Sequence, residues 1–215
     1  MRAVHLFLKR TNAPHRLCAV SDGVYAFALT LLVLDLKVPE VAEITNPQLT
    51  TDLLKQLPNF FAYAIGFSVV AFFWNVHHRV FQSITSCDTR AVMLNFAHLL
   101  FISLTPYGAS LIGHYEGDRI ATIVFSSDLG LASLSMNVLG HYVLAKKEWR
   151  TNDTGGTWVK IPLWTTYTGP GIALVSILVS FINIDVALFL WFLLPLRDLA
   201  ILLRSSPGPS PINNP

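Results

Sequence analysis

Charged residues are scarce in this sequence of 215 residues: Asp, Glu, Lys and Arg make up 13% of it, against roughly 25% in ordinary soluble domains. Hydrophobic residues make up 53%, and the mean hydropathy is +0.51. A soluble domain needs charged helix faces turned toward water, and this chain cannot supply them. The composition excludes a disordered or fibrous protein and indicates a protein of the lipid bilayer.

Several chemical signatures are also missing. Two cysteines, Cys18 and Cys87, are too few for a disulfide framework or a zinc site, and no C-x-x-C is present. The net charge of +2 is not concentrated in a block, so nothing favours a nucleic-acid partner. There is no G-x-S-x-G, H-E-x-x-H, P-loop or dinucleotide-binding fingerprint. The sequence therefore favours neither an enzyme nor a protein with a metal or cofactor.

Long apolar segments are abundant instead. A membrane-spanning helix needs about 20 mostly apolar residues, and six segments meet this length. They are residues 17–36, 57–76, 91–113, 120–145, 161–182 and 186–203. The sequence predicts an all-α membrane protein with six transmembrane helices in one domain, residues 1–204. Residues 205–215 contain four prolines and are predicted to be a disordered tail.

The positive charges predict the orientation of these spans. If the N-terminus is inside, twelve of the fifteen Lys and Arg residues fall on the inner side. Only Lys37, Lys55 and Arg119 fall outside. Short cytoplasmic loops carry the excess of Lys and Arg, so we expect both termini in the cytoplasm and an even number of spans.

The first span has two different faces. Helical spacing of about 100° per residue groups apolar side chains on one side; these are Val20, Gly23, Val24, Phe27, Leu31 and Leu34, with Thr30 and Asp35 at the edges. Asp22 points the opposite way. Ionisable groups inside a membrane are costly, so Asp22 either lines an ion path or, as we expect, is a buried structural group.

Two histidines at the end of the second span lie at the depth of Ser21 and Asp22. We expect one of His77 or His78 to join a structural network with Arg16, Ser21 and Asp22. A metal site on this histidine pair is disfavoured, because adjacent helical residues diverge by about 100° and no third ligand is evident.

Small and polar residues recur at helical spacing in the fourth span, at Ser126, Gly130, Ser133, Asn137 and Gly140. Such a stripe predicts a face that packs closely on another helix. Asp128 lies off this stripe, and it is either a proton or cation site or a partnered structural carboxylate. We expect His98 and His141 to form hydrogen bonds between helices.

The run RLCAVSDGVYAFALTLLVL at residues 16–34 resembles the first-helix signature of the transmembrane protein 175 family of potassium channels, R-x-x-x-F-S-D followed by an apolar run. Similar stretches follow in the next two spans, at FAY (61–63), NVHHR (75–79), LN (94–95) and LTP (104–106). About the first 115 residues carry the resemblance. Two positions depart from the pattern: Val20 replaces the motif's phenylalanine, and Phe27 stands where relatives have isoleucine or leucine.

The resemblance implies a homotetramer of six-span subunits in which the first helix of each lines a central pore. It implies constricting side chains at Phe27, Leu31 and Leu34, a selectivity-linked hydroxyl at Thr30, and K+ as the permeant ion without a cofactor. The chain contains one six-span unit, as in the prokaryotic branch, so the implied location is a bacterial cell membrane.

The function predicted from these observations is a potassium-permeable cation channel whose apolar constriction acts as gate and filter. Two alternatives stay open. One is a proton-coupled secondary transporter that uses Asp128 and the intramembrane histidines, and the other is a membrane scaffold that conducts no ions.

Overall fold

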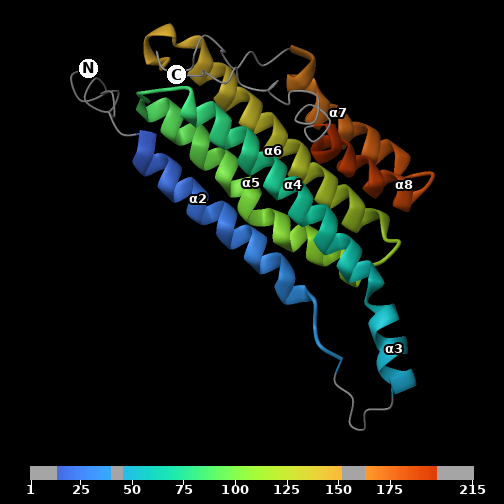
Figure 1. Cartoon of the computed structure of the whole chain (residues 1–215). Helices are drawn as coiled ribbons and strands as arrows, with labels where there is room; N and C mark the ends of the chain where they lie inside the picture. The colour runs from blue at the N-terminus through green and yellow to red at the C-terminus, as the bar shows by residue number, and fades with distance from the viewer. Residues whose placement is uncertain (1–13, 40–45, 152–162, 198–215) are drawn as a thin grey trace, which may run out of the picture.

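The structure, a computed structural model, describes residues 14–39, 46–151 and 163–197. Four long helices lie side by side in a bundle: α2 (Pro14–Leu31), α4 (Leu57–Gln82), α5 (Thr89–His114) and α6 (Arg119–Ala145). Helix α2 lies at one edge of the bundle, where it packs on α4 and α5 (Figure 1). Helices α7 (Leu163–Val179) and α8 (Ile184–Phe189) lie at the opposite edge, next to α6 (Figure 1).

Four helical segments are long and apolar enough to cross a membrane: Pro14–Asp35, Leu57–Gln82, Thr89–His114 and Arg119–Ala145. They coincide with the first four predicted spans. The first of them includes a short 3-10 turn, η1 (Leu32–Asp35), that continues directly from α2. The prediction of an all-α protein with apolar spanning helices is therefore confirmed for these four.

The last two predicted spans are described only in part. Helix α7 has 17 residues, and α8 is followed by a 3-10 turn, η3 (Leu190–Phe192), after which residues 193–197 are again helical. Residues 161–162 and 198–203 of these predicted spans lie outside the described residues, as does the predicted tail at 205–215. The count of six spans stays a prediction.

Side-chain caps determine where two of the long helices begin. The carboxylate of Asp88 accepts a hydrogen bond from the Ala91 amide at 2.9 Å at the start of α5. Asp118 does the same for the Ala121 amide at the start of α6. An Asp at this position satisfies one of the free N–H groups of the first turn, which explains why the apolar runs become helical from these residues onward.

One helix was not expected. The sequence predicts a plain linker between the first two spans, but residues 46–55 of that linker form α3 (Asn46–Lys55), which lies beyond the end of the bundle (Figure 1). The Lys55 ammonium pairs with Asp52 at 2.8 Å, one turn earlier on the same helix. This helix was not predicted, because α3 lacks the long apolar run by which the other helices were found.

The polar stripe of the fourth span packs on α7, as predicted. Ser126 and Ser176 hydroxyls are hydrogen-bonded at 2.9 Å, and the Trp191 indole N–H donates to Ser126 Oγ at 3.2 Å. A Cβ added to Gly130 would lie 2.6 Å from the Cβ of Ala173. Absence of a side chain at residue 130 lets the two helices approach this closely.

Candidate functional site

Helix α2 presents one face to the bundle and leaves the other exposed. The buried side chains recur at helical spacing and are Pro14, Leu17, Ser21, Tyr25, Ala28 and, in the following turn, Leu32. The opposite side carries the apolar face that the sequence singled out. Phe27 is 64% exposed and Leu34 is 67% exposed, so the rest of the described chain does not cover them.

Hydrogen bonds from the buried face anchor α2 to α4 and α5. The Asn95 side-chain amide donates to Ser21 Oγ at 2.9 Å, and Ser21 in turn donates to the Leu17 carbonyl at 2.9 Å. The other end of the amide, Asn95 Oδ1, lies 2.7 Å from His77 Nε2. An amide oxygen only accepts, so His77 is the donor. Asn95 thus joins three helices through buried, satisfied groups.

A second polar contact lies deeper on the same face. The Tyr25 hydroxyl lies 2.6 Å from His98 Nε2, and His98 Nδ1 lies 3.0 Å from the Ala132 carbonyl of α6. A carbonyl can only accept, so Nδ1 donates, and Nε2 accepts from the tyrosine. The prediction that His98 bonds between helices is confirmed, since its ring connects α5 to both α2 and α6.

Asp22 has a different partner from those expected. Its Oδ1 accepts a hydrogen bond from the Trp74 indole N–H at 2.9 Å, and its side chain is exposed. The sequence had assigned it a buried place with Arg16, Ser21 and a histidine. That assignment was wrong within the described residues, because Ser21 and Asp22 are adjacent on the helix and therefore face directions about 100° apart.

The two histidines at the end of α4 take different roles. His77 is buried and belongs to the Asn95 network. His78 stacks on the Trp74 ring, with centroids 5.2 Å apart, and its Nε2 is 2.7 Å from the Gln82 side-chain amide. His78 therefore supports the tryptophan that binds Asp22. Sequence reasoning gave no role to Trp74 or Asn95. The available signals were a lone amide or indole within an apolar run and, for Asn95, its place in the LN stretch of the resemblance.

The apolar stripe, in which Phe27 and Leu34 are exposed and Leu31 is half-buried, crosses a change in helix geometry. Phe27 and Leu31 lie on α2, whereas Leu34 lies on the 3-10 turn η1. A 3-10 helix rises about 2.0 Å and turns about 120° per residue, so Leu34 lies roughly 60° around from its position on a continuous α-helix. The stripe is about 12 Å long rather than the 10 Å of a regular helix.

Thr30 lies within this exposed face. Its hydroxyl donates to the Phe27 carbonyl at 2.9 Å, which uses its proton and leaves its oxygen lone pairs available. Beside it, a groove of about 440 Å³ runs along α2. Six of the residues that line the groove come from α2, and Ser103 of α5 forms the opposite wall.

Asp128 is buried in the middle of α6. Its Oδ2 accepts from the Thr105 hydroxyl at 3.0 Å, whereas Oδ1 has no hydrogen-bond partner among the described residues. No group of three or more His, Cys, Asp or Glu side chains comes together as a metal site in the part of the chain that the structure describes.

Known proteins match the segment that builds this site. A family profile described as the endosomal/lysosomal potassium channel TMEM175 matches residues 16–106, which include the polar groups that hold α2 on α4 and α5. A protein named potassium channel, from Chamaesiphon minutus, is 27% identical over 182 residues, covering 83% of this chain and 90% of that protein. A protein named endosomal/lysosomal proton channel TMEM175, from Gallus gallus, is 34% identical over 115 residues.

That match with the Gallus gallus protein covers 51% of this chain and only 23% of the longer relative. Among solved structures, the crystal structure of a lysosomal potassium-selective channel TMEM175 homolog from Chamaesiphon minutus covers 92% of this chain and 100% of its own, with 26% identity and a TM-score of 0.70. Sequence and fold agree along nearly the whole chain. The chain therefore resembles the TMEM175 family, and the relatives named here are ion channels.

Proposed function

We propose that the chain is one subunit of a homotetrameric, potassium-permeable cation channel. The observation that carries this proposal is the apolar face of α2, which the described chain leaves exposed although the opposite face of the same helix is fully anchored. Four copies of such a face around an axis would enclose a narrow path. The name of the Chamaesiphon minutus relative, potassium channel, supports K+ as the permeant ion.

The stripe of Phe27, Leu31 and Leu34 is the proposed constriction. A ring of apolar side chains offers an ion no replacement for its hydration shell, so a narrow apolar neck is an energy barrier even when it is not closed by contact. Such a neck loses water readily, and the same side chains then act as gate and filter. Monovalent cations pass through it in single file.

Thr30 is the proposed selectivity residue. Its hydroxyl proton is occupied by the Phe27 carbonyl, so the oxygen faces the path as an acceptor. One such oxygen from each of four subunits forms a ring that partly replaces the water around a cation. The network of Ser21, Asn95 and His77 keeps the helix in the rotation that points Thr30 toward the path.

We further propose six spans per subunit, a cell membrane as the location, and both termini in the cytoplasm. The distribution of Lys and Arg supports this orientation. Helices α7 and α8 would form the fifth and sixth spans, with residues outside the described ranges extending them.

The second candidate is a proton-coupled transporter. The observation that favours it is Asp128, a buried carboxylate with one oxygen unpartnered among the described residues. The vertebrate relative is named a proton channel, which makes protons a permeant ion to test in either mechanism.

Recording from the purified chain in a planar bilayer tests these proposals. We expect single-channel currents that reverse near the K+ equilibrium potential and persist without a proton gradient, together with four chains per particle by light scattering on gel filtration. Potassium flux that stops when the proton gradient is collapsed would favour the transporter instead. Folded protein without any current would leave only a scaffold.

A further inference from the structure

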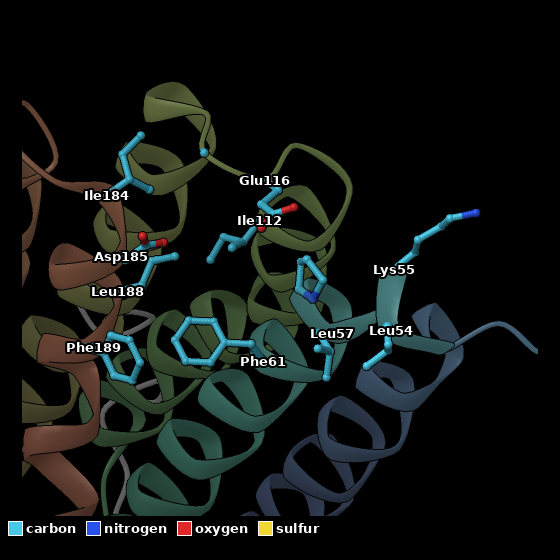
Figure 2. Close-up of a pocket in the computed structure, with 12 residues that line it drawn as sticks. Leu54, Lys55, Leu57, Phe61, Ile112, Glu116, Ile184, Asp185, Leu188 and Phe189 are labelled. Atoms are coloured by element: carbon cyan, nitrogen blue, oxygen red, sulfur yellow. The ribbon is translucent and has the colours of Figure 1, made fainter. Parts of the chain in front are cut away.

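A pocket of about 460 Å³ opens at the end of the bundle where α5 ends and α4 begins (Figure 2). Its walls come from α3, the start of α4, the end of α5 with the turn after it, and α8. None of its lining residues borders the groove along α2. The pocket is therefore a separate site from the groove.

The floor of the pocket is apolar and partly aromatic. Phe61 and Phe189 pack against each other there, with ring centroids 4.8 Å apart and planes tilted by 56° (Figure 2). Ile112 and Leu188, which are both buried, also line the pocket. A surface of this kind favours an apolar ligand, and the faces of the two rings also attract a cation.

The charges at the mouth are negative. Glu116 and Asp185 are exposed on opposite sides of the opening, and neither forms a hydrogen bond or ion pair within the described part of the chain. Lys55 also lies at the rim, but its ammonium pairs with Asp52 at 2.8 Å and points away from the pocket (Figure 2). A ligand entering the pocket meets two carboxylates before it meets the rings.

We propose that this pocket binds an amphiphilic amine, with its ammonium group between Glu116 and Asp185 and its apolar part on the phenylalanine floor. An anion would be repelled by the two carboxylates, and a small inorganic cation would gain nothing from the apolar floor. The pocket lies at the ends of helices that are apolar enough to span a membrane, which is the depth of lipid headgroups. A lipid amine and a free amphiphilic amine share this chemistry.

Binding of decyltrimethylammonium below its micelle concentration tests the proposal on the purified full chain, in nanodiscs of phosphatidylglycerol. We expect saturable binding by calorimetry, and about three- to fivefold weaker affinity in each of Asp185→Asn and Glu116→Gln, the effect of one exposed ion pair. Phe189→Ala should weaken binding without a change in the charge of the mouth. The matched control is Glu148→Gln, which removes one negative charge outside the pocket.

Decyl sulfonate, with the same tail and the opposite charge, provides the contrast. Equal affinity for the two amphiphiles, or unchanged ammonium binding when both carboxylates are replaced in protein that elutes like wild type, would overturn the proposal. A comparison of nanodiscs with and without phosphatidylethanolamine shows whether the natural ligand is a membrane lipid or a free amine. Lipid retained by wild type in native mass spectrometry and displaced by the probe indicates a membrane lipid, and probe binding without retained lipid indicates a free amine.

Discussion

Leu32 and Leu34 offer a matched pair of identical side chains in opposite surroundings. They lie two residues apart on the same 3-10 turn, yet Leu32 is 2% exposed and Leu34 is 67% exposed. Leu32 packs tightly on α4, where a Cβ added to Gly66 would lie 2.9 Å from its Cδ2. The same substitution, to alanine, should therefore have different consequences at the two positions.

Leu32→Ala should lower the free energy of unfolding by about 2–5 kcal/mol, the usual cost of a buried leucine replaced by alanine. Only about a third of the surface of Leu34 is covered. Leu34→Ala should therefore lower the free energy of unfolding by about 0.5–1 kcal/mol, a third of the value for a fully buried side chain. In the proposed channel, Leu34→Ala also shortens a constricting side chain and should increase the unitary current. Leu32→Ala should reduce the number of folded channels and leave the unitary current of the remainder unchanged.

Two measurements on the same preparations distinguish these outcomes: thermal unfolding of the purified variants in one detergent, and single-channel recording after reconstitution. Gel filtration shows whether each variant keeps the oligomeric state of wild type. Equal losses of thermal stability in both variants, with no gain of current in Leu34→Ala, would refute the assignment of the exposed face to a pore.

Three further substitutions test other parts of the structure. Thr30→Val keeps the shape of the side chain and removes its oxygen, so the potassium-over-sodium preference, measured as the reversal potential under bi-ionic conditions, should fall while the protein stays folded. Asn95→Leu leaves a buried hydroxyl and a buried imidazole without their partner and should cost about 1–3 kcal/mol of stability in a thermal scan; a neutral result would remove Asn95 from the anchoring network. Gly130→Val should separate α6 from α7, because its Cβ would already be 2.6 Å from that of Ala173, and a variant as heat-stable as wild type would contradict this packing.

The long helices could be predicted because each combines an apolar run with a local start signal. The runs that become α5 and α6 each begin just after an aspartate that caps the helix. The apolar composition and the capping residue therefore both predict a helix from the same position. Helix α3 lacks a long apolar run and was missed, although Asn46 followed by Pro47 is a common start signal of a helix. The ends of the last two predicted spans lie outside the described residues, so the lengths of these spans stay a prediction.

The partner of Asp22 could not be predicted, since helical spacing gives the direction of a side chain on its own helix but not the rotation of the neighbouring one. Depth alone made Trp74, His77 and His78 equally available to Asp22. The structure assigns the indole to the carboxylate and His77 to Asn95: Trp74 is exposed, as Asp22 is, whereas His77 is buried with Asn95.

The polar anchors explain how a membrane helix can keep one apolar face exposed. In lipid, apolar side chains gain little from turning toward a protein neighbour rather than toward acyl chains, so apolar packing specifies the rotation of α2 only weakly. Hydrogen bonds specify it strongly, because a buried donor or acceptor has few partners. Ser21 and Tyr25 each reach a partner on α5 that itself bonds to another helix, and any other rotation of α2 would break both contacts. The same rotation leaves Phe27 and Leu34 facing away from the bundle, so the network that stabilises the fold also selects which side chains are available to form a pore.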